Sequence, residues 1–308
     1  MKLKIDVPIT KQPLKEEWPS FYMMGSCFAQ SQAERMASLG FEVDANPFGI
    51  IYNPRSIATI LERVTHNLAY SPIDFKLREK AFSWEHHGSF TYSSTEKAAE
   101  ASNQILHQIK TDISKANVVV ITLGTSLVYT YSGSTVANCH KIPTKEFEQK
   151  QLTFTEVKES IETITKHVSQ LNKDAHILFT VSPIRHLRSG VQESSRSKAT
   201  LLSALHEVID KTKSTSYFPS YEIFIDELRD YRFAKEDMTH PTSLAQDYIW
   251  QRFCETYFSD RTIGILEEVK KYTQLTAHRP IHDPNLHQKQ VTKKRITLQT
   301  NYPFLQLK

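Results

Sequence analysis

The sequence is poor in glycine, in cysteine and in long apolar runs. Only 8 of its 308 residues are glycine and only 3 are cysteine. An odd and low cysteine count provides no disulfide framework, so the thiols are expected to be free. No apolar run approaches the ~18 residues of a membrane-spanning helix, and residues 1–9 lack the apolar core of a secretory signal. We therefore expect a cytoplasmic protein, in which a thiol remains reduced.

The chain also lacks a strong excess of one charge. Its 38 basic and 34 acidic residues leave a net charge of +4, which is too small to predict nucleic-acid binding. Hydrophobic residues make up 39% and charged residues 23% of the chain, as in a globular protein with a core of its own. Cys139 and His140 are adjacent and no two cysteines form a C-x-x-C pair, so no metal ion or other cofactor is expected.

Short β-like runs alternate with longer helical patterns along the chain. The runs at 117–123 and 175–181 are apolar and rich in β-branched residues, which predicts fully buried strands. Such alternation predicts an α/β fold with a mostly parallel, flavodoxin-like sheet of about five strands between two layers of helices, a three-layer sandwich. The other expected elements are strands at 21–24 and 221–225, a hairpin of 127–131 and 135–138, and helices at 28–39, 53–66, 97–114, 153–172, 197–211, 241–258 and 262–272.

We expect one catalytic domain over residues 1–260. Residues 261–308 are expected to form a C-terminal helix and a basic tail that packs on this domain or trails from it, loosely packed from residue 276 onward. The segment 270–295 interleaves Lys, Arg and His with few aromatic residues. This composition is typical of a solvated tail, and contact with an anionic polymer or a partner protein is the alternative.

The turn Gly25-Ser26-Cys27 directly follows the first expected strand and opens a helix. A side chain at this position feels the free N–H groups and the positive end of the helix dipole. Such surroundings lower the pKa of a cysteine, and the same N–H groups can stabilise an oxyanion. Cys27 is therefore a candidate nucleophile, and a small buried apolar side chain is the alternative interpretation.

The segment Asp237-Met238-Thr239-His240 places a carboxylate one turn away from a histidine. The carboxylate can hold the ring through Nδ1 and leave Nε2 free as a base. Pro241 is expected to begin the long helix that follows and so to hold His240 at its entrance. The alternative is that Asp237 is a turn residue and His240 a surface histidine.

Together these motifs resemble the SGNH hydrolases, which carry a G-D-S nucleophile turn, a glycine, a G-x-N and a D-x-x-H in this order along the chain. The five residues from Gly25 to Ala29 spell the signature of the GSCFA-domain family, and the similarity runs from about residue 21 to residue 258. The segments that carry it are Gly25-Ser26-Cys27-Phe28-Ala29, Asn46-Pro47-Phe48-Gly49, Tyr52-Asn53-Pro54, Gly124-Thr125-Ser126, Asn138-Cys139-His140-Lys141 and Asp237-Met238-Thr239-His240-Pro241.

Two positions depart from the SGNH pattern. Cys27 stands where a serine nucleophile is expected, and a thiol is the better nucleophile at neutral pH, with Ser26 as the alternative. Ser126 stands where the pattern has an oxyanion-binding asparagine, and its side chain is shorter. The resemblance therefore implies an oxyanion hole made mainly of the N–H groups of Cys27 and Gly49. Asn46, together with Ser26 and Ser126, is a further candidate at this subsite.

Three polar residues follow other expected strands and are candidates for substrate binding. Asn138 and His140 follow the hairpin, where a structural role is the alternative. Arg185 follows the strand at 175–181, so it is expected at the edge of the sheet where ligands bind. Its guanidinium can bind an anionic substrate group or pair with a surface carboxylate.

The resemblance implies an acyl-transfer enzyme, either an esterase or an acyltransferase. Cys27 would attack an acyl carbonyl, His240 would act as the base and Asp237 would orient His240. The implied substrate is an acylated small molecule or carbohydrate, with a possible acyl donor such as acyl-coenzyme A. The alternative is a non-catalytic module of the same fold that binds a carbohydrate or a partner protein.

Overall fold

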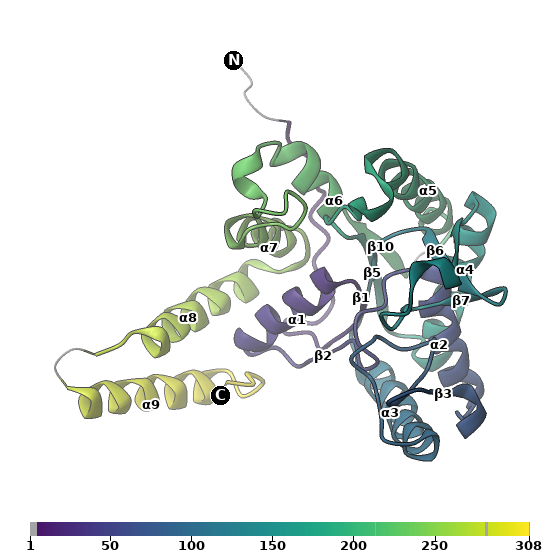
Figure 1. Cartoon of the computed structure of the whole chain (residues 1–308). Coiled ribbons are helices and arrows are strands. Elements are labelled where there is room, and N and C mark those ends of the chain that lie inside the picture. Colours follow the sequence, from purple (N-terminus) through teal and green to yellow (C-terminus); the bar gives the residue numbers. More distant parts are fainter. Residues whose placement is uncertain (1–4, 213, 281–282, 308) are drawn as a thin grey trace.

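The computed structural model describes residues 5–212, 214–280 and 283–307 (Figure 1). Among these residues no helix is long and apolar enough to cross a membrane.

A five-stranded parallel sheet forms the centre of the molecule. The strand order is β10-β9-β5-β1-β2, and all four pairings are parallel. Taken in sequence order, this is the 2-1-3-4-5 order of flavodoxin-like sheets, so the predicted fold class is confirmed. The strands are β1 (Phe21–Gly25), β2 (Val43–Ala45), β5 (Val118–Leu123), β9 (His176–Val181) and β10 (Thr215–Phe218).

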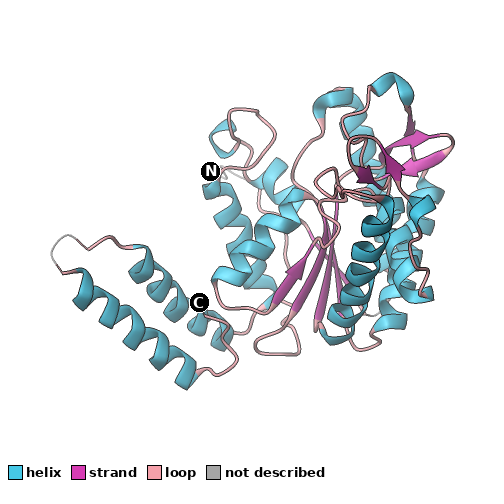
Figure 2. Ribbon diagram, turned by 60° about the horizontal axis from the view of Figure 1, so that its bottom comes forward, coloured by secondary structure: helices cyan, strands magenta, loops and turns pink. Residues whose placement is uncertain are grey.

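Helices cover both faces of this sheet (Figure 2). Tyr22 and Val119 point to one face and pack against α2, α3, α4 and α5. Their chain neighbours Phe21 and Val118 point to the other face and pack against α1 and α7, as the two-residue period of a strand requires. These helices are α1 (Cys27–Ser38), α2 (Pro54–His66), α3 (Thr95–Lys115), α4 (Phe154–Leu171), α5 (Val191–Ile209) and α7 (Ser243–Tyr257).

Two small antiparallel sheets lie outside the central one. The predicted hairpin is present as β6 and β7, and a third strand, β8, pairs with β6 on its other side. Phe82, Val136, Ile142 and Phe147 form a separate apolar cluster beneath it. The strands are β3 (Lys76–Leu77), β4 (Ala81–Phe82), β6 (Leu127–Tyr131), β7 (Ser134–Val136) and β8 (Glu148–Gln151), and the short helical turns are η1 (Pro72–Asp74), η2 (Thr144–Glu146) and η3 (Leu187–Ser189).

The C-terminal part forms a helical hairpin that extends away from the sheet (Figure 1). It consists of α8 (Asp260–Ala277) and α9 (Pro284–Asn301). Leu298 of α9 is buried against Ile265 and Val269 of α8. The prediction of a loosely packed tail from residue 276 onward was therefore wrong for α9, because the apolar residues of these two helices pack on each other.

The predicted strand at 221–225 was also wrong. This segment forms α6 (Ser220–Glu222) and a π-helical turn, η4 (Ile223–Glu227), followed by η5 (Tyr231–Phe233). Ile223 and Phe224 pack on the α1–α7 side of the core from a helical backbone. The fifth strand is instead Thr215–Phe218, whose residues pair with 177–180 of β9.

Two helix starts also differ from the prediction. α5 begins at Val191 rather than at residue 197, directly after Gly190, which has a φ of +95°. α7 begins at Ser243, and its N-cap is Thr242, whose hydroxyl accepts the N–H of Ala245. Pro241 therefore precedes the helix and pairs with Ala234 in an isolated bridge.

Candidate active site

The nucleophile turn follows β1 without any intervening loop. Gly25 has a φ of +138°, and a Cβ at this position would lie 2.1 Å from the carbonyl oxygen of Thr122, so only glycine fits against β5 here. Ser26 is the N-cap of α1, and its buried hydroxyl accepts the N–H of Phe28 at 3.2 Å. Cys27 is the first residue of the helix and is half-buried.

The structure brings Cys27, His240 and Asp237 together. Cys27 Sγ lies 4.0 Å from His240 Nε2, and His240 Nδ1 lies 2.6 Å from Asp237 Oδ2. The carboxylate therefore fixes Nδ1 as the protonated nitrogen and leaves Nε2 to accept a proton from the thiol. A sulfur–nitrogen distance of this length is at the outer limit of a hydrogen bond, and such contacts tighten when a substrate binds.

The loop before α7 sets the position of His240. Asp237 Oδ1 accepts the N–H groups of Thr239 and His240, each at 2.9 Å. Met238 takes a left-handed conformation with a φ of +57°, and the N–H of Lys235 donates to the carbonyl of His240. The N–H of His240, then that of Thr239, lower the pKa of Asp237 well below its ordinary value, so the carboxylate stays charged.

The thiol of Cys27 is not activated in the way that the sequence predicted. Burial raises its pKa, and this outweighs the opposing effects of the N–H groups of Cys27 and Phe28 and of the cations Lys198 and Lys235. The expectation of a lowered pKa was therefore wrong, because α1 begins inside the protein rather than at its surface. A proton must leave the sulfur before it can act as a nucleophile.

Gly49 and Asn46 help to stabilise the turn that carries Cys27. The N–H of Gly49 donates to the carbonyl of Asn46 at 2.7 Å, and the amide oxygen of Asn46 accepts the N–H of Gly25 at 2.8 Å. Asn46 also donates to Gln30 on α1. Both residues are therefore close to the site, but the Gly49 N–H already donates to Asn46, and the Phe28 N–H already donates to Ser26. The N–H of Cys27 is thus the main candidate oxyanion donor.

Ser126 lies in a buried network at the base of α5. Its hydroxyl donates to the carbonyl of Ser197 at 3.0 Å and accepts the side-chain N–H of Gln151. It is fully buried, so its polar contacts join β8 to α5. Ser126 takes no part in an oxyanion hole in this arrangement.

Asn138 and His140 hold the loop after β7. Asn138 Oδ1 accepts the N–H of His140 at 2.8 Å, and His140 Nε2 donates to the carbonyl of Ser83 at 2.8 Å. His140 has a φ of +48°, so this segment is not extended, and Cys139 is half-buried rather than in the core. Both candidates make structural contacts, which was the alternative interpretation.

Three further residues lie around the site. The rings of Tyr52 and His186 stack with their centres 4.7 Å apart, and a Cβ on Gly124 would lie 2.8 Å from Cβ of Tyr52. Burial, and after it the charge of Lys198, lower the pKa of His186 to about 4. Tyr52 belongs to the Tyr-Asn-Pro motif and His186 follows Arg185, so the sequence indicated both segments, whereas nothing in the sequence indicated Lys198.

Lys198 is a buried cation on α5. Its side chain is 2% exposed, and Nζ donates to the carbonyl of Ser182 at 2.7 Å. Burial, and after it the charge of Arg185, lower its pKa to about 7 against the opposing effects of Glu222 and Cys27. Lys198 is thus an electrostatic neighbour of both Arg185 and the nucleophile.

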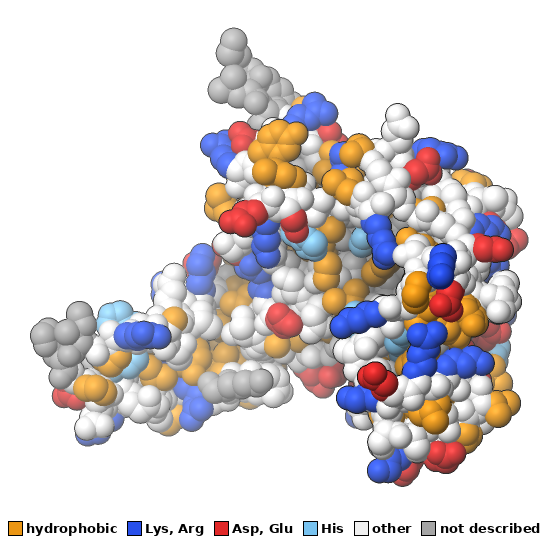
Figure 3. Space-filling view, in the orientation of Figure 1, with side chains coloured by type: hydrophobic (Ala, Val, Ile, Leu, Met, Phe, Trp, Pro, Cys, Tyr) orange, Lys and Arg blue, Asp and Glu red, His pale blue; other side chains and the backbone are white. Residues whose placement is uncertain are grey.

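Figure 3 shows one face of the molecule. Histidine side chains lie in its hollowed middle, and Lys and Arg side chains surround them. The described residues include no group of three or more His, Cys, Asp or Glu that could hold a metal ion. His278 and His282 have the spacing of a two-histidine motif, but residue 282 lies outside the described residues.

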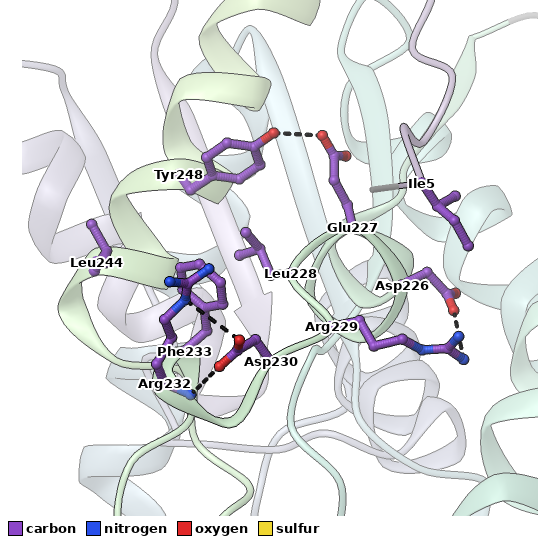
Figure 4. Close-up of a pocket in the computed structure, with 10 residues that line it drawn as sticks. All are labelled: Ile5, Asp226, Glu227, Leu228, Arg229, Asp230, Arg232, Phe233, Leu244 and Tyr248. Atoms are coloured by element: carbon purple, nitrogen blue, oxygen red, sulfur yellow. Dashed lines mark hydrogen bonds and ion pairs between the residues drawn. The ribbon is translucent and has the colours of Figure 1, made fainter. Parts of the chain in front are cut away.

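A hollow lies beside the loop that carries Asp237 and His240. It has a volume of about 710 Å³, and neither Cys27 nor His240 lines it. Figure 4 shows that its charged side chains already have partners. Asp226 pairs with Arg229 and Asp230 with Arg232, and Glu227 accepts the hydroxyl of Tyr248. Glu227 also forms an ion pair with Arg252 at 3.6 Å. Because these charges are already compensated, this hollow offers an added ion little.

The sequence was also compared with known proteins. The sequence profile of the GSCFA family matches residues 20–253, a range that contains the nucleophile turn, the His240 loop and all five strands of the central sheet. The match ends within α7, so the hairpin of α8 and α9 lies outside it. No curated protein matches the chain.

Proposed function

The chain belongs to the GSCFA family, and we propose that it is an acyl-transfer enzyme with Cys27 as its nucleophile. The proposal depends on one observation above all: Cys27 Sγ lies 4.0 Å from His240 Nε2, while Nδ1 of the same ring is bound to the carboxylate of Asp237. This is the order of nucleophile, base and orienting acid in a catalytic triad. Cys27 is preferred to Ser26 as the nucleophile because the hydroxyl of Ser26 already accepts the N–H of Phe28 as the N-cap of α1.

In the proposed mechanism, His240 removes the proton from Cys27 as the sulfur attacks the acyl carbon. The raised pKa of Cys27 makes this base necessary, since the free thiolate is scarce at neutral pH. The carbonyl oxygen becomes an oxyanion that accepts from the N–H of Cys27 at the start of α1. The carbon–oxygen or carbon–sulfur bond of the donor then breaks, His240 gives its proton to the leaving group, and a thioester remains on Cys27.

The thioester can pass its acyl group to water or to another acceptor. Amines and thiols attack a thioester readily and water attacks it slowly, so we propose that transfer is faster than hydrolysis. The SGNH resemblance favours an acylated small molecule or carbohydrate as the substrate. A reactive cysteine needs reducing surroundings, so we place the protein in the cytoplasm.

A binding module is the second candidate, and the raised pKa of Cys27 is the observation that favours it. A thiol that stays protonated is also what an inert, half-buried cysteine would show. The two candidates differ in whether His240 can make the sulfur react with an acyl group.

Product partitioning tests the proposal. The protein is incubated with an activated acyl ester, or with acyl-coenzyme A, with and without a mixture of sugar acceptors, and the products are analysed by mass spectrometry. Acylated acceptor formed by wild type but not by Cys27→Ala supports transfer. If free acid is the only product and the acceptor does not change its rate of formation, the esterase proposal stands and the transferase proposal fails. If wild type and Cys27→Ala give the same products at the same rates, the enzyme proposal fails.

A further inference from the structure

A second hollow, of about 400 Å³, lies on the side of the active-site loop that carries Met238 and Thr239. It is bounded by the segment after β9, by the helical turns after β10 and by this loop. Its walls combine apolar side chains with charged ones. The lining residues are Arg185, Phe224, Ile225, Arg229, Asp230, Tyr231, Ala234, Met238 and Thr239.

Arg185 differs from the other charged residues of this hollow. Its Nε is buried and has no hydrogen-bond partner, and among the described residues no carboxylate forms an ion pair with it. By contrast, Arg229 pairs with Asp226 at 3.7 Å, and Asp230 pairs with Arg232 at 3.6 Å. A guanidinium has five N–H donors and no acceptor, so burying one of them without a partner carries a cost.

Lys198 makes the burial of the Arg185 guanidinium still less favourable. Its ammonium is buried and donates to the neutral carbonyl of Ser182, and no carboxylate in the described part of the chain forms an ion pair with it. The charge of Arg185 disfavours the protonated form of Lys198, so the two cations repel each other at the edge of the sheet. An anion bound at Arg185 would supply the missing acceptor and weaken this repulsion.

We propose that Arg185, supported by Lys198, binds a phosphate or carboxylate group on the alcohol or thiol portion of the acyl substrate. The inference rests on the proposed function, because it assigns the substrate class of the same site. The position of the anionic group in the substrate follows from the loop that carries His240. His240 gives its proton to the leaving group, and the hollow adjoins Thr239, the residue before His240. The anionic group therefore lies on the leaving-group or acceptor side, and the acyl chain lies on the other side of Cys27.

The reaction then balances as follows. The bond from Cys27 sulfur to the acyl carbon forms, and the bond from that carbon to the oxygen or sulfur of the anionic leaving group breaks. The thiol proton passes through His240 to the departing atom. The anionic group of the leaving molecule stays bound to Arg185 until release, and an acceptor that carries the same group can take its place.

Matched thioesters test this assignment. S-acetyl-3-mercaptopropionate is compared with the neutral S-acetyl-3-mercaptopropionamide, and S-acetyl-2-mercaptoethyl phosphate with the neutral S-acetyl-2-mercaptoethanol. Acylation of Cys27 is followed by intact-protein mass spectrometry. We expect wild type to react at least about tenfold faster with the anionic member of one pair, as one charge-assisted contact of about 1.5 kcal/mol gives. A preference within the first pair indicates a carboxylate group in the substrate, and a preference within the second pair indicates a phosphate.

Variants identify the residue responsible. Arg185→Met should bring the ratio of anionic to neutral rates close to one, and Arg185→Lys should keep part of it. Arg196→Met is the matched control, since Arg196 is an exposed arginine on α5 paired with Glu193, and it should keep the full ratio. Equal rates within both pairs for wild type, or an unchanged ratio in Arg185→Met, would overturn the inference. If the neutral thioesters still acylate Cys27, the proposed function survives that result.

A binding measurement covers the case in which no thioester reacts. Inorganic phosphate or acetate is titrated into the protein at constant ionic strength, and Tm is recorded. A saturable rise in Tm for wild type and Arg196→Met, but not for Arg185→Met, supports the anion site without acyl transfer. If Arg185→Met does not fold, the uncharged Arg185→Gln takes its place. No rise with either anion for wild type contradicts the site.

Discussion

Cys27 and His240 are 213 residues apart in the sequence, yet Cys27 Sγ lies 4.0 Å from His240 Nε2. The contact joins the first residue of α1 to the loop before α7, and both helices pack on the same face of the sheet. Their side chains can therefore meet only in the folded chain. Each variant below is judged by a chemical readout and by a separate measure of stability, so that a folding defect is not mistaken for lost chemistry.

Asp237→Asn should lower the rate of Cys27 acylation by roughly 10⁴, as the same exchange does in a serine protease triad. The amide nitrogen would face Nδ1 of His240 and favour the tautomer with its proton on Nε2, which cannot accept the proton of the thiol. Single-turnover acylation measures the rate. Asp260→Asn, which removes an exposed partner of Lys11, is the control and should leave the acylation rate unchanged. Activity of Asp237→Asn within a few-fold of wild type would remove Asp237 from the mechanism.

The alkylation of Cys27 by iodoacetamide should depend on pH with a midpoint above the ordinary thiol pKa of about 8.5. Burial raises the pKa of Cys27, while the cations Lys198 and Lys235 partly oppose this effect. Peptide mapping after timed alkylation gives the rate at Cys27 separately from Cys139 and Cys254. Lys235→Met should move the midpoint further upward, because it removes a cation that favours the thiolate, and the exposed Lys211→Met should not. A midpoint near neutral pH would mean that the resting state is a thiolate–imidazolium pair.

Ser26→Ala should cost about 1 kcal/mol of stability, the usual effect of losing a helix N-cap. Its hydroxyl accepts the N–H of Phe28, and this N–H would be left without that partner. Urea denaturation measures the free energy of unfolding, and acylation should remain detectable because the nucleophile is still present. Complete loss of acylation in a folded Ser26→Ala variant, with full activity in Cys27→Ser, would exchange the roles of the two residues.

The stability of wild type should rise more steeply with pH than that of Lys198→Met. Burial lowers the pKa of Lys198 from 10.5 to about 7, so between these values the unfolded chain binds a proton that the folded chain does not, and stability rises as that proton is lost. The expected difference is about 2 kcal/mol between pH 7 and pH 9. Urea denaturation at both pH values measures it, with Lys211→Met as the exposed control. Parallel pH dependences for wild type and Lys198→Met would contradict a buried cation at this position.

The central sheet could be predicted from the sequence because its inner strands consist of apolar and β-branched residues. The runs that became β5 and β9 are buried along nearly their whole length and have few alternatives to a parallel sheet. The edge strand Thr215–Phe218 was not predicted, because its short run contains polar residues. The segment 221–225 looked like a strand, but its apolar residues pack from a helical turn. A short apolar run alone cannot distinguish the two.

Cys27, Asp237 and His240 could be singled out because they lie in two specific local motifs, the Gly-Ser-Cys turn and the Asp-x-x-His segment, although only the fold brings these motifs together. The oxyanion candidates were harder, since they depend on where single N–H groups point. Gly49 is near the turn as expected, but its N–H is bound to the carbonyl of Asn46. Nothing in the sequence indicated that Lys198 is buried, because a lysine within a polar helical segment usually faces solvent. Only the packing of α5 reveals its burial.

The most direct test of the central claim is to trap the acyl-enzyme and locate it. Wild type is mixed with an activated acetyl ester, quenched in acid, digested and mapped by mass spectrometry. We predict a single acetyl group on the peptide that contains Cys27, removable by neutral hydroxylamine as a thioester is, and absent from Cys27→Ala. Cys254→Ala, which removes another half-buried cysteine, on α7, should be acylated as wild type is. An unmodified Cys27 peptide in folded wild type, or equal labelling of His240→Ala, would contradict the claim that His240 makes Cys27 a nucleophile.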